Sequence, residues 1–255
     1  MKKEIEFYGK TINVDLENLK VKLDNITYDL TPVYNDKILK AHKEGKVFLS
    51  YNDNIINQAD SKPIYFSARS IMERKLEDEV LYMDFLVYNN EQRIFPDGIL
   101  NRSLGHKNDV AEFEVHQVIE GTVLSIIKLD DKVTYVGIFK KGDYFEIPAA
   151  AFHCSYILEG PAIVANFYCQ TYWGNDITKK PYFTINNDIS IKTSGEEFSL
   201  FSSNDKNENK FTVDSFSSIF NNRNFRDYKE LYEEKILVKD YSEHKSIFDL
   251  FYSSL

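Results

Sequence analysis

The chain has 255 residues, of which 43% are hydrophobic and 15% aromatic, so it is globular rather than intrinsically disordered. Its net charge of −9 and the lack of a basic patch argue against nucleic acid or an anionic membrane as partner. The opening MKKEIEFYGK lacks an apolar signal core, no apolar run approaches the ~20 residues that cross a bilayer, and two cysteines make no disulfide framework. We therefore expect a cytoplasmic protein.

Residues 1–75 are predicted to form an N-terminal extension that packs on a central domain. The pieces TINVDL and VKLDNITYDL alternate between apolar and polar residues, which indicates short strands. One helix is expected near residues 35–44. The polar stretch YNDNIINQADSKP is typical of a loop, and its Pro63 separates the extension from the central domain.

Residues 76–190 are predicted to form this central domain as a β-barrel or sandwich. Runs of eight to twelve residues rich in Val, Ile, Tyr and Phe include LYMDFLVY, TVLSIIKL, KVTYVGIF and AIVANFYCQTYW. Short turns such as LDDK, KKGD and LEGP separate them. Regular short strands without a helical pattern between them indicate an all-β domain. Asp84, Asp97 and Asp109 are interpreted as strand-end and turn residues.

Residues 191–255 are predicted to form a loop and a helical tail. SSNDKNENK contains no apolar residue and is expected to be an exposed loop. An amphipathic helix is expected from the helical spacing of Phe225, Tyr228, Leu231, Tyr232 and Ile236. A second helix is expected to begin at Ser242, and we expect the tail to dock on the barrel or on another subunit.

The stretch GHKNDVAEFEVHQVIEG holds two of the five histidines of the chain. Residues two apart in a strand share a face, so His106 and Asn108 are expected on one face of their strand, and Glu114 and His116 on one face of theirs. His153 lies further along the chain, after a turn marked by Pro148 and three alanines. A lone histidine on a β face is more often a core residue than a ligand. Together, however, these nitrogen and oxygen donors suit Fe, Mn, Zn, Ni or Co.

The glycine spacing around this cluster resembles the two signature motifs of the cupin superfamily. Glu114 is followed by six residues and Gly121, and Gly142 leads after five residues to Pro148 and after four more to His153. Asn108, Ala150 and Ile157 depart from the motifs, at positions where cupins have His, Gly and Asn. The resemblance implies a single cupin jelly-roll barrel with extensions at both ends.

Within the cupins, the order of segments resembles the cupin-type glucose-6-phosphate isomerases. NRSLGHKN, EVHQVIEG, EIPAAAFH and ANFYCQTYWGND stand where that family has its phosphate, metal and sugar segments, over roughly residues 81–183. The resemblance implies that a divalent metal such as Fe, Mn, Zn or Ni is held by His106, Asn108, Glu114 and His153. It implies further that the substrate phosphate contacts Arg102, Ser103 and Gly105, and the sugar contacts Tyr168, Tyr172 and Trp173.

His116 stands where the family has an active-site tyrosine. It is either a catalytic group beside Glu114 or a third imidazole ligand that replaces Asn108, and a third possibility is that the site has lost its metal. An amide oxygen is a weaker metal donor than an imidazole, so a site with Asn108 would bind its metal less tightly.

Three functions are compatible with these residues. The first is a metal-dependent sugar-phosphate isomerase or epimerase that works through an enediol, with Glu114 or His116 moving the proton. The second is another metal-dependent cupin enzyme such as an Fe(II) oxygenase, in which His106, Glu114 and His153 form the ligand set. The third is a non-catalytic sugar- or metabolite-binding cupin. The resemblance also implies a homodimer.

Overall fold

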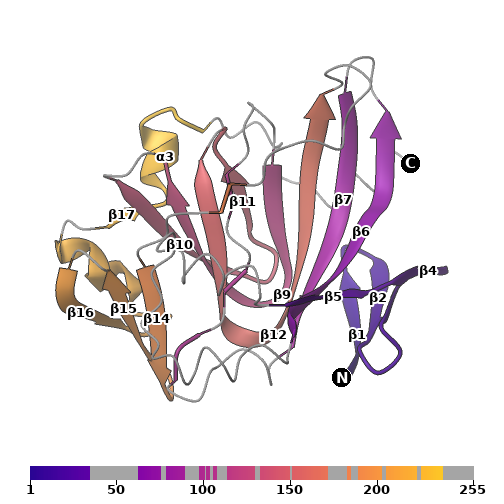
Figure 1. Cartoon of the computed structure of the whole chain (residues 1–255), viewed down its shortest axis with the longest axis horizontal. Helices are drawn as coiled ribbons and strands as arrows, with labels where there is room; N and C mark the ends of the chain where they lie inside the picture. The colour runs from indigo at the N-terminus through magenta and orange to yellow at the C-terminus, as the bar shows by residue number, and fades with distance from the viewer. Residues whose placement is uncertain are drawn as a thin grey trace.

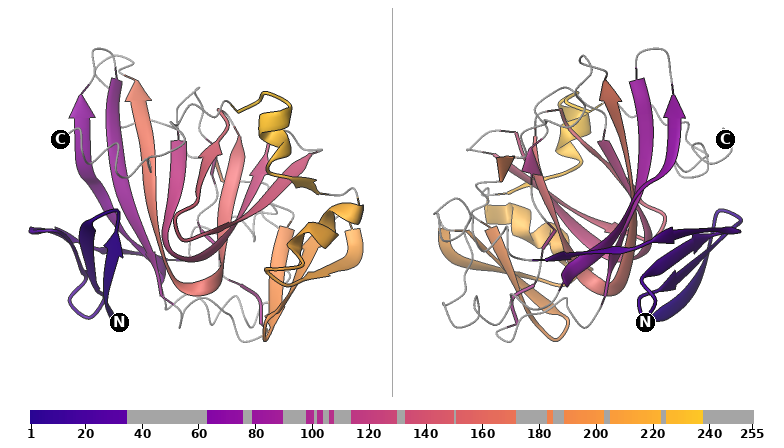
Figure 2. Two further views of the ribbon diagram at one scale, coloured as in Figure 1. Left: turned by 180° about the vertical axis from the view of Figure 1, so that it is seen from behind. Right: turned by 45° about the vertical axis from the view of Figure 1, so that its right-hand side comes forward.

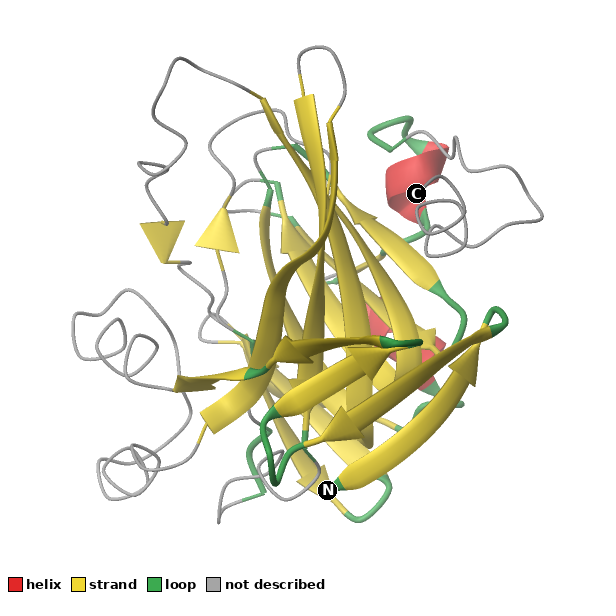
Figure 3. Cartoon of the chain, turned by 90° about the vertical axis from the view of Figure 1, so that its right-hand side faces the viewer, coloured by secondary structure: helices red, strands yellow, loops and turns green. Residues whose placement is uncertain are grey.

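The computed structural model describes residues 1–34, 63–75, 79–89, 98–100, 102–103, 106–107, 114–129, 133–149, 151–171, 183–184, 189–202, 205–222 and 225–237. Strands make up most of these residues, as Figure 3 shows, so the predicted mainly β fold class is confirmed. Within the described part of the chain, no helix is long and apolar enough to cross a membrane.

A small antiparallel sheet opens the chain. Its strands lie in the order β1 (Lys2–Phe7), β2 (Lys10–Asp15), β3 (Lys20–Leu23) and β4 (Ile26–Asp29). Apolar residues alternate with polar ones and are buried, for example Ile12 and Val14 on β2. These side chains pack against Phe85, Val87 and Phe167 on the outer face of the central sheet. The alternation predicted from TINVDL is therefore confirmed.

The central sheet runs in the order β17-β10-β9-β12-β7-β6-β5, and β8, β11 and β13 join it at the side. Its strands are β5 (Thr31–Tyr34), β6 (Pro63–Lys75), β7 (Glu79–Tyr88), β8 (His106–Lys107), β9 (Glu114–Lys128), β10 (Thr134–Lys140), β11 (Tyr144–Ile147), β12 (Phe152–Thr171), β13 (Phe183–Thr184) and β17 (Arg226–Asp227). The sheet already begins at β5 and β6, before residue 76.

Two long paired strands, β9 and β12, bend together and fold this sheet back on itself. Figure 1 shows β12 curving through the base of the molecule. The bend lies at Gly121, whose φ of +84° favours glycine and where an added Cβ would stand 2.7 Å from the Glu159 carbonyl oxygen. The folded sheet encloses an apolar interior that includes Val118, Ile127 and Phe145. The result is a barrel of the jelly-roll type.

A three-stranded sheet covers the other side of the barrel, opposite the N-terminal sheet (Figure 2). It consists of β14 (Ile189–Ser194), β15 (Glu197–Ser202) and β16 (Asp205–Phe211). The prediction of an exposed loop over residues 202–210 is wrong for most of its length. Polar residues form β16 there because β15 supplies the ladder partners, and Asn209 Nδ2 donates a hydrogen bond to the Leu200 carbonyl over 3.5 Å.

The tail continues with the 3₁₀ helix η3 (Phe216–Asn222), β17 and the short helix α3 (Glu230–Glu233). The predicted amphipathic helix is thus much shorter than expected, because Arg226 and Asp227 pair with β10 as a strand instead. Phe225, Tyr228 and Leu231 are buried as predicted, whereas Ile236 is exposed. The helices expected near residue 40 and from Ser242 lie outside the described residues.

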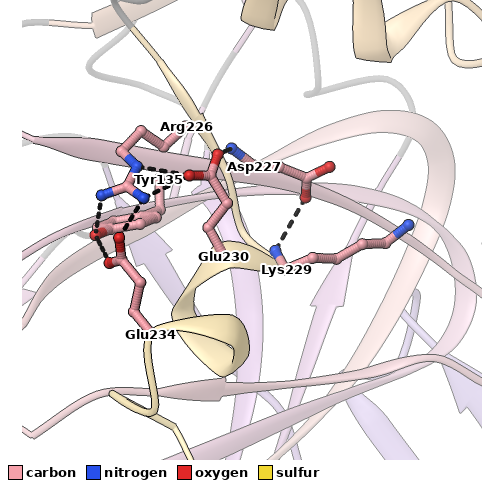
Figure 4. A network of polar contacts seen from close by, with 6 residues as sticks. All are labelled: Tyr135, Arg226, Asp227, Lys229, Glu230 and Glu234. Carbon is pink, nitrogen blue, oxygen red and sulfur yellow. Dashed lines mark hydrogen bonds and ion pairs between the residues drawn. The ribbon is translucent and has the colours of Figure 1, made fainter.

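A polar cluster fastens this tail to the barrel, and we call it the C-terminal clamp (Tyr135, Arg226, Glu230 and Glu234; Figure 4). Arg226 Nε donates to Glu230 Oε2 over 2.8 Å, and Arg226 Nη2 also bonds Glu234. The Tyr135 hydroxyl donates to Glu234 Oε2 over 2.9 Å and accepts from Arg226 Nη1 over 3.1 Å. The guanidinium carbon lies 5.1 Å from the centre of the Tyr135 ring, within cation–π range.

Candidate metal centre

Glu114 and His116 begin strand β9 and face the barrel interior. They alternate with Val115, which belongs to the core on the outer face of the sheet. Across from them on β11 lie Ile147 and Phe145, both members of the interior core. Glu114 is 3% exposed and His116 is 7% exposed, so a carboxylate and an imidazole share a nearly dry environment.

His153 reaches the same place from the opposite half of the barrel. In the β9–β12 ladder its partner is Ile127, at the far end of β9 from Glu114. Because both strands bend near Gly121, the two ends face each other across the interior. His153 Nε2 lies 3.6 Å from Glu114 Oε1, and His116 Nε2 lies 3.1 Å from the same oxygen. The predicted convergence of these three side chains is therefore present.

The three side chains can hold a divalent transition metal ion. Their nearest ligand atoms all lie within 4.8 Å of one another, and all three residues are buried. Two ligands that each lie ~2.1 Å from one ion are roughly 3.0 to 3.4 Å apart at octahedral or tetrahedral angles. The observed separations of 3.1 and 3.6 Å are close to that range. Two imidazoles and one carboxylate suit Fe, Mn, Zn, Ni or Co.

Asn166 contacts this group, and its role was not predicted from the sequence. It lies directly opposite His116 on β12, and its Nδ2 donates to Glu114 Oε1 over 3.2 Å. An amide that fixes the orientation of a ligating carboxylate is typical of the surroundings of metal ligands. The polar Asn inside the apolar run AIVANFY is the only sequence signal for it.

The remaining predicted ligands are placed only in part. The backbone of His106 pairs with His153 across β8 and β12, which puts the two Cα atoms opposite each other. The side chain of His106, together with Asn108 and Gly105, lies outside the described residues. The His116 imidazole is in contact with Glu114, and the choice between Asn108 and His116 as metal ligand stays a prediction.

Arg102 does not lie with this group. Its backbone forms a bridge with Tyr156, and its guanidinium lies against the Cys154 thiol. Cys154 and Tyr156 belong to the core beneath β14–β16, on the opposite face of β12 from His153. Burial raises the pKa of the Cys154 thiol, and Arg102 lowers it in part. This placement does not support a phosphate contact beside the metal for Arg102.

Ser103 and Tyr168 are the other predicted substrate residues that the structure describes. Ser103 Oγ accepts a hydrogen bond from the Ser155 amide over 2.9 Å, so it anchors a strand end. Tyr168 lies directly opposite Glu114 on β12 and stacks on Tyr82 with ring centres 5.4 Å apart. Tyr172 and Trp173 lie outside the described residues.

The interpretation of Asp84 as a strand-end or turn residue is wrong. Asp84 stands within β7, is fully buried, and lies directly opposite Asn166. The interpretation fails because turn carboxylates are common, whereas a carboxylate inside the apolar run LYMDFLVY needs a buried partner.

Comparisons with known proteins give only partial overlaps. No protein-family model and no curated protein sequence matches the chain. Among solved structures, KdgF from Halomonas sp. matches with a TM-score of 0.31 and 14% identity over 44% of this chain and 86% of that one. A deletion mutant of Bacillus subtilis oxalate decarboxylase OxdC matches with a TM-score of 0.31 and 16% identity over 47% of this chain.

Recombinant oxalate oxidase in complex with glycolate also matches, with a TM-score of 0.28 and 17% identity over 36% of this chain. The match spans only 28% of the oxalate decarboxylase chain and 42% of the oxalate oxidase chain. These structure neighbours are cupin-family proteins. At such low similarity the overlaps define neither a reaction nor a substrate, and both must be argued from the site.

Proposed function

We propose that this chain is a metal-dependent cupin enzyme that isomerises or epimerises a sugar phosphate. One observation carries the proposal: two imidazole nitrogens converge on a carboxylate oxygen inside the barrel. His116 Nε2 lies 3.1 Å from Glu114 Oε1, and His153 Nε2 lies 3.6 Å from the same oxygen. Three ionisable groups at this depth cost stability unless they share a cation or a proton. A bound metal ion accounts for their placement.

Glu114, His116 and His153 are the proposed ligands, and His106 is proposed as a fourth. The pairing of the His106 backbone with His153 supports this addition, because directly opposed residues of paired strands are neighbours. A metal bound here would act as a Lewis acid on the carbonyl and the adjacent hydroxyl of an open-chain sugar. The hydrogen bond from Asn166 Nδ2 would hold the Glu114 carboxylate in the orientation that such an ion needs.

The proposed proton carrier is Glu114 or His116. Isomerisation moves one proton between neighbouring carbons through an enediol and needs no external oxidant. The His116 Nε2 atom cannot be a ligand and a base at once, so its two roles are distinguishable. If His116 is a base, His116→Gln keeps the metal and loses turnover. If it is a ligand, the same change loses both.

Metal content followed by substrate profiling tests the proposal. The full chain, purified without chelators, is analysed for bound transition metals and then assayed with Mn²⁺ or Fe²⁺ on a panel of aldose and ketose phosphates by NMR. We expect interconversion of at least one pair. If the chain binds no transition metal and its melting temperature does not change when one is added, the proposal fails. The chain would then be a non-catalytic binding protein with the barrel but without the metal.

An Fe(II) oxygenase is the second candidate. The specific observation in its favour is the ligand set among the described residues, two histidines and one carboxylate, which is the facial triad of many non-haem iron oxygenases. Oxygen consumption that depends on Fe²⁺ and on an added organic substrate, without sugar-phosphate interconversion, would favour it.

The proposal includes a cytoplasmic homodimer. The N-terminal sheet supports self-association, because the large apolar residues exposed on it include Tyr8 and Ile26, the latter 60% exposed. Sedimentation at several concentrations tests the dimer, and imaging of a fluorescently tagged chain tests the location.

A further inference from the structure

An ion pair lies on the same interior face as the metal group. Asp84 on β7, Asn166 on β12 and His116 on β9 are directly opposite one another in successive strands, so their side chains share one face. The neighbours of Asp84, Met83 and Phe85, belong to the outer core, which agrees with this direction. Asp84 binds Arg69, whose Nη1 donates to Asp84 Oδ2 over 2.6 Å.

The backbone of β6 is shaped to make this contact. The register between β6 and β7 shifts between Ala68 and Met72, and Ser70 within the bulge has a φ of +51°. The Ser70 amide donates to Asp84 Oδ1 over 2.6 Å. A non-glycine residue with positive φ is strained, and bulges next to binding sites redirect side chains. Here the bulge holds Arg69 and Ser70 on one carboxylate.

The two partners differ sharply in exposure. The Asp84 side chain is 0% exposed, whereas that of Arg69 is 50% exposed. The buried carboxylate therefore holds one nitrogen of a guanidinium whose side chain is half exposed. A fixed, partly exposed guanidinium suits a planar or tetrahedral anion, because it loses little side-chain freedom on binding.

A hydrogen-bond acceptor lies between this ion pair and the metal group. Asn166 is 7% exposed and uses Nδ2 on Glu114, while its Oδ1 is buried with no hydrogen-bond partner among the residues that the structure describes. A buried carbonyl oxygen without a donor costs free energy, and a ligand hydroxyl would satisfy it. Tyr168, with its hydroxyl 3.5 Å from Asp84 Oδ1, flanks the same position.

We propose that Arg69, held by Asp84, binds the anionic end of a hydroxylated substrate whose other end reaches the Glu114–His116–His153 group. Adjacent strands lie ~4.8 Å apart, so the Asp84 and His116 backbones are roughly 10 Å apart, which suits a ligand of about five or six carbons. The shared chemistry is a phosphate or a carboxylate. The inference rests on the proposed function for the metal-bound end only, because the anion site needs no metal.

Anion titration of the full chain tests this inference. Inorganic phosphate and succinate are titrated separately, by calorimetry, into chelator-treated protein and into protein reloaded with Mn²⁺. We expect saturable binding of at least one anion with and without metal, and at least tenfold weaker binding by Arg69→Gln. The control Lys22→Gln removes an exposed positive charge on β3 and should bind as the parent does.

Because Arg69→Gln leaves a buried carboxylate without its cation, the double variant Arg69→Gln/Asp84→Asn is tested beside it. We expect the double variant to keep the parent melting temperature and Mn²⁺ binding while losing the anion. Parent-like anion affinity in either variant overturns the inference, as does anion binding that disappears when the metal is removed. Succinate binding without phosphate binding supports the anion site and contradicts a sugar phosphate as substrate.

Discussion

The buried Glu114–His116–His153 group and the C-terminal clamp both place glutamate carboxylates beside nitrogen atoms, but they differ in exposure. Glu114 is 3% exposed, and its Oε1 faces three nitrogen atoms from His116, His153 and Asn166. In the clamp, the side chains of Arg226 and Glu234 are 33% and 38% exposed, and each has an oppositely charged partner. Solvent screens the clamp and makes it a modest fastening. The buried group is costly unless a cation or a shared proton balances its charge.

The largest expected effect is a loss of Mn²⁺ affinity when the buried group is changed, whereas a change in the clamp should leave this affinity intact. Glu114→Gln should reduce Mn²⁺ affinity roughly 100-fold or more, since changes even to residues around metal ligands cost 10- to 100-fold. Because the change also removes a buried charge, the melting temperature of the metal-free protein should stay level or rise. Calorimetric Mn²⁺ titration and thermal unfolding measure both effects.

Glu120→Gln is the matched control. Glu120 lies on the same strand, but it pairs with Lys3 and Lys141 near the surface. Its metal affinity should equal that of the parent. If Glu114→Gln and the parent bound Mn²⁺ with equal affinity, the ion would not be bound by Glu114.

A smaller effect on metal affinity is expected for Asn166, which contacts a proposed ligand without being one. Asn166→Ala removes the hydrogen bond to Glu114 Oε1 but no ligand, so Mn²⁺ affinity should fall by about tenfold. Restoration by Asn166→Gln, which keeps the amide, would show positioning rather than packing. An unchanged affinity in Asn166→Ala, measured in the same titration, would reduce Asn166 to a core residue.

Breaking the clamp should change stability slightly and leave metal binding intact. Arg226→Gln is expected to lower the melting temperature by a few degrees at neutral pH, as for other partly exposed ion pairs. Arg226 and the Tyr135 hydroxyl hold the pKa of Glu234 below its usual value. This contribution to stability is present above the ordinary carboxyl pKa and is lost as the pH falls through the lowered one.

The difference between Arg226→Gln and the parent should therefore shrink in acid. Thermal unfolding of both proteins across the acidic range measures it. A difference that stays constant with pH would mean that Arg226 acts through packing on Tyr135 instead of through charge.

A further effect is expected only in alkali, next to the clamp. Burial raises the pKa of Tyr232 to about 12 and also raises that of Tyr228. Above the unfolded-state value of ~10, the unfolded chain loses these protons first, so the free energy of unfolding should fall between pH ~10 and ~12. Tyr232→Phe should make the fall shallower in urea titrations. An identical slope in the two proteins would assign the effect to other groups.

The sequence predicted the barrel better than its ends. Strand β10 is an apolar run between two turns, and local pattern is enough to identify it. The prediction of separate short runs is wrong for β9 and β12, which each join two of these runs, and the predicted turn LEGP lies within β12. The strand β16 could not be predicted, because its polar residues are ordered by the neighbouring β15 rather than by their own pattern. The helical tail was overestimated for the same reason, since pairing with β10 converts its first residues to a strand.

The candidate site divides in the same way. Glu114, His116 and His153 were found by strand alternation and motif spacing. Arg69, Asp84 and Asn166 were missed because they meet through the register of β6, β7 and β12, which no local pattern specifies. Arg102 was placed by resemblance, and the actual direction of its side chain depends on which face of β12 it meets.

The shared bend of β9 and β12 also has a kinetic consequence. Glu114 and His153 meet only after these two strands have paired along their length and turned at Gly121. Such long-range pairing forms late and slowly compared with local structure. The candidate metal ligands are therefore far apart in the unfolded chain, and an ion bound by them would stabilise the closed barrel rather than nucleate its folding. Removing the ion should then speed unfolding and leave the folding rate nearly unchanged.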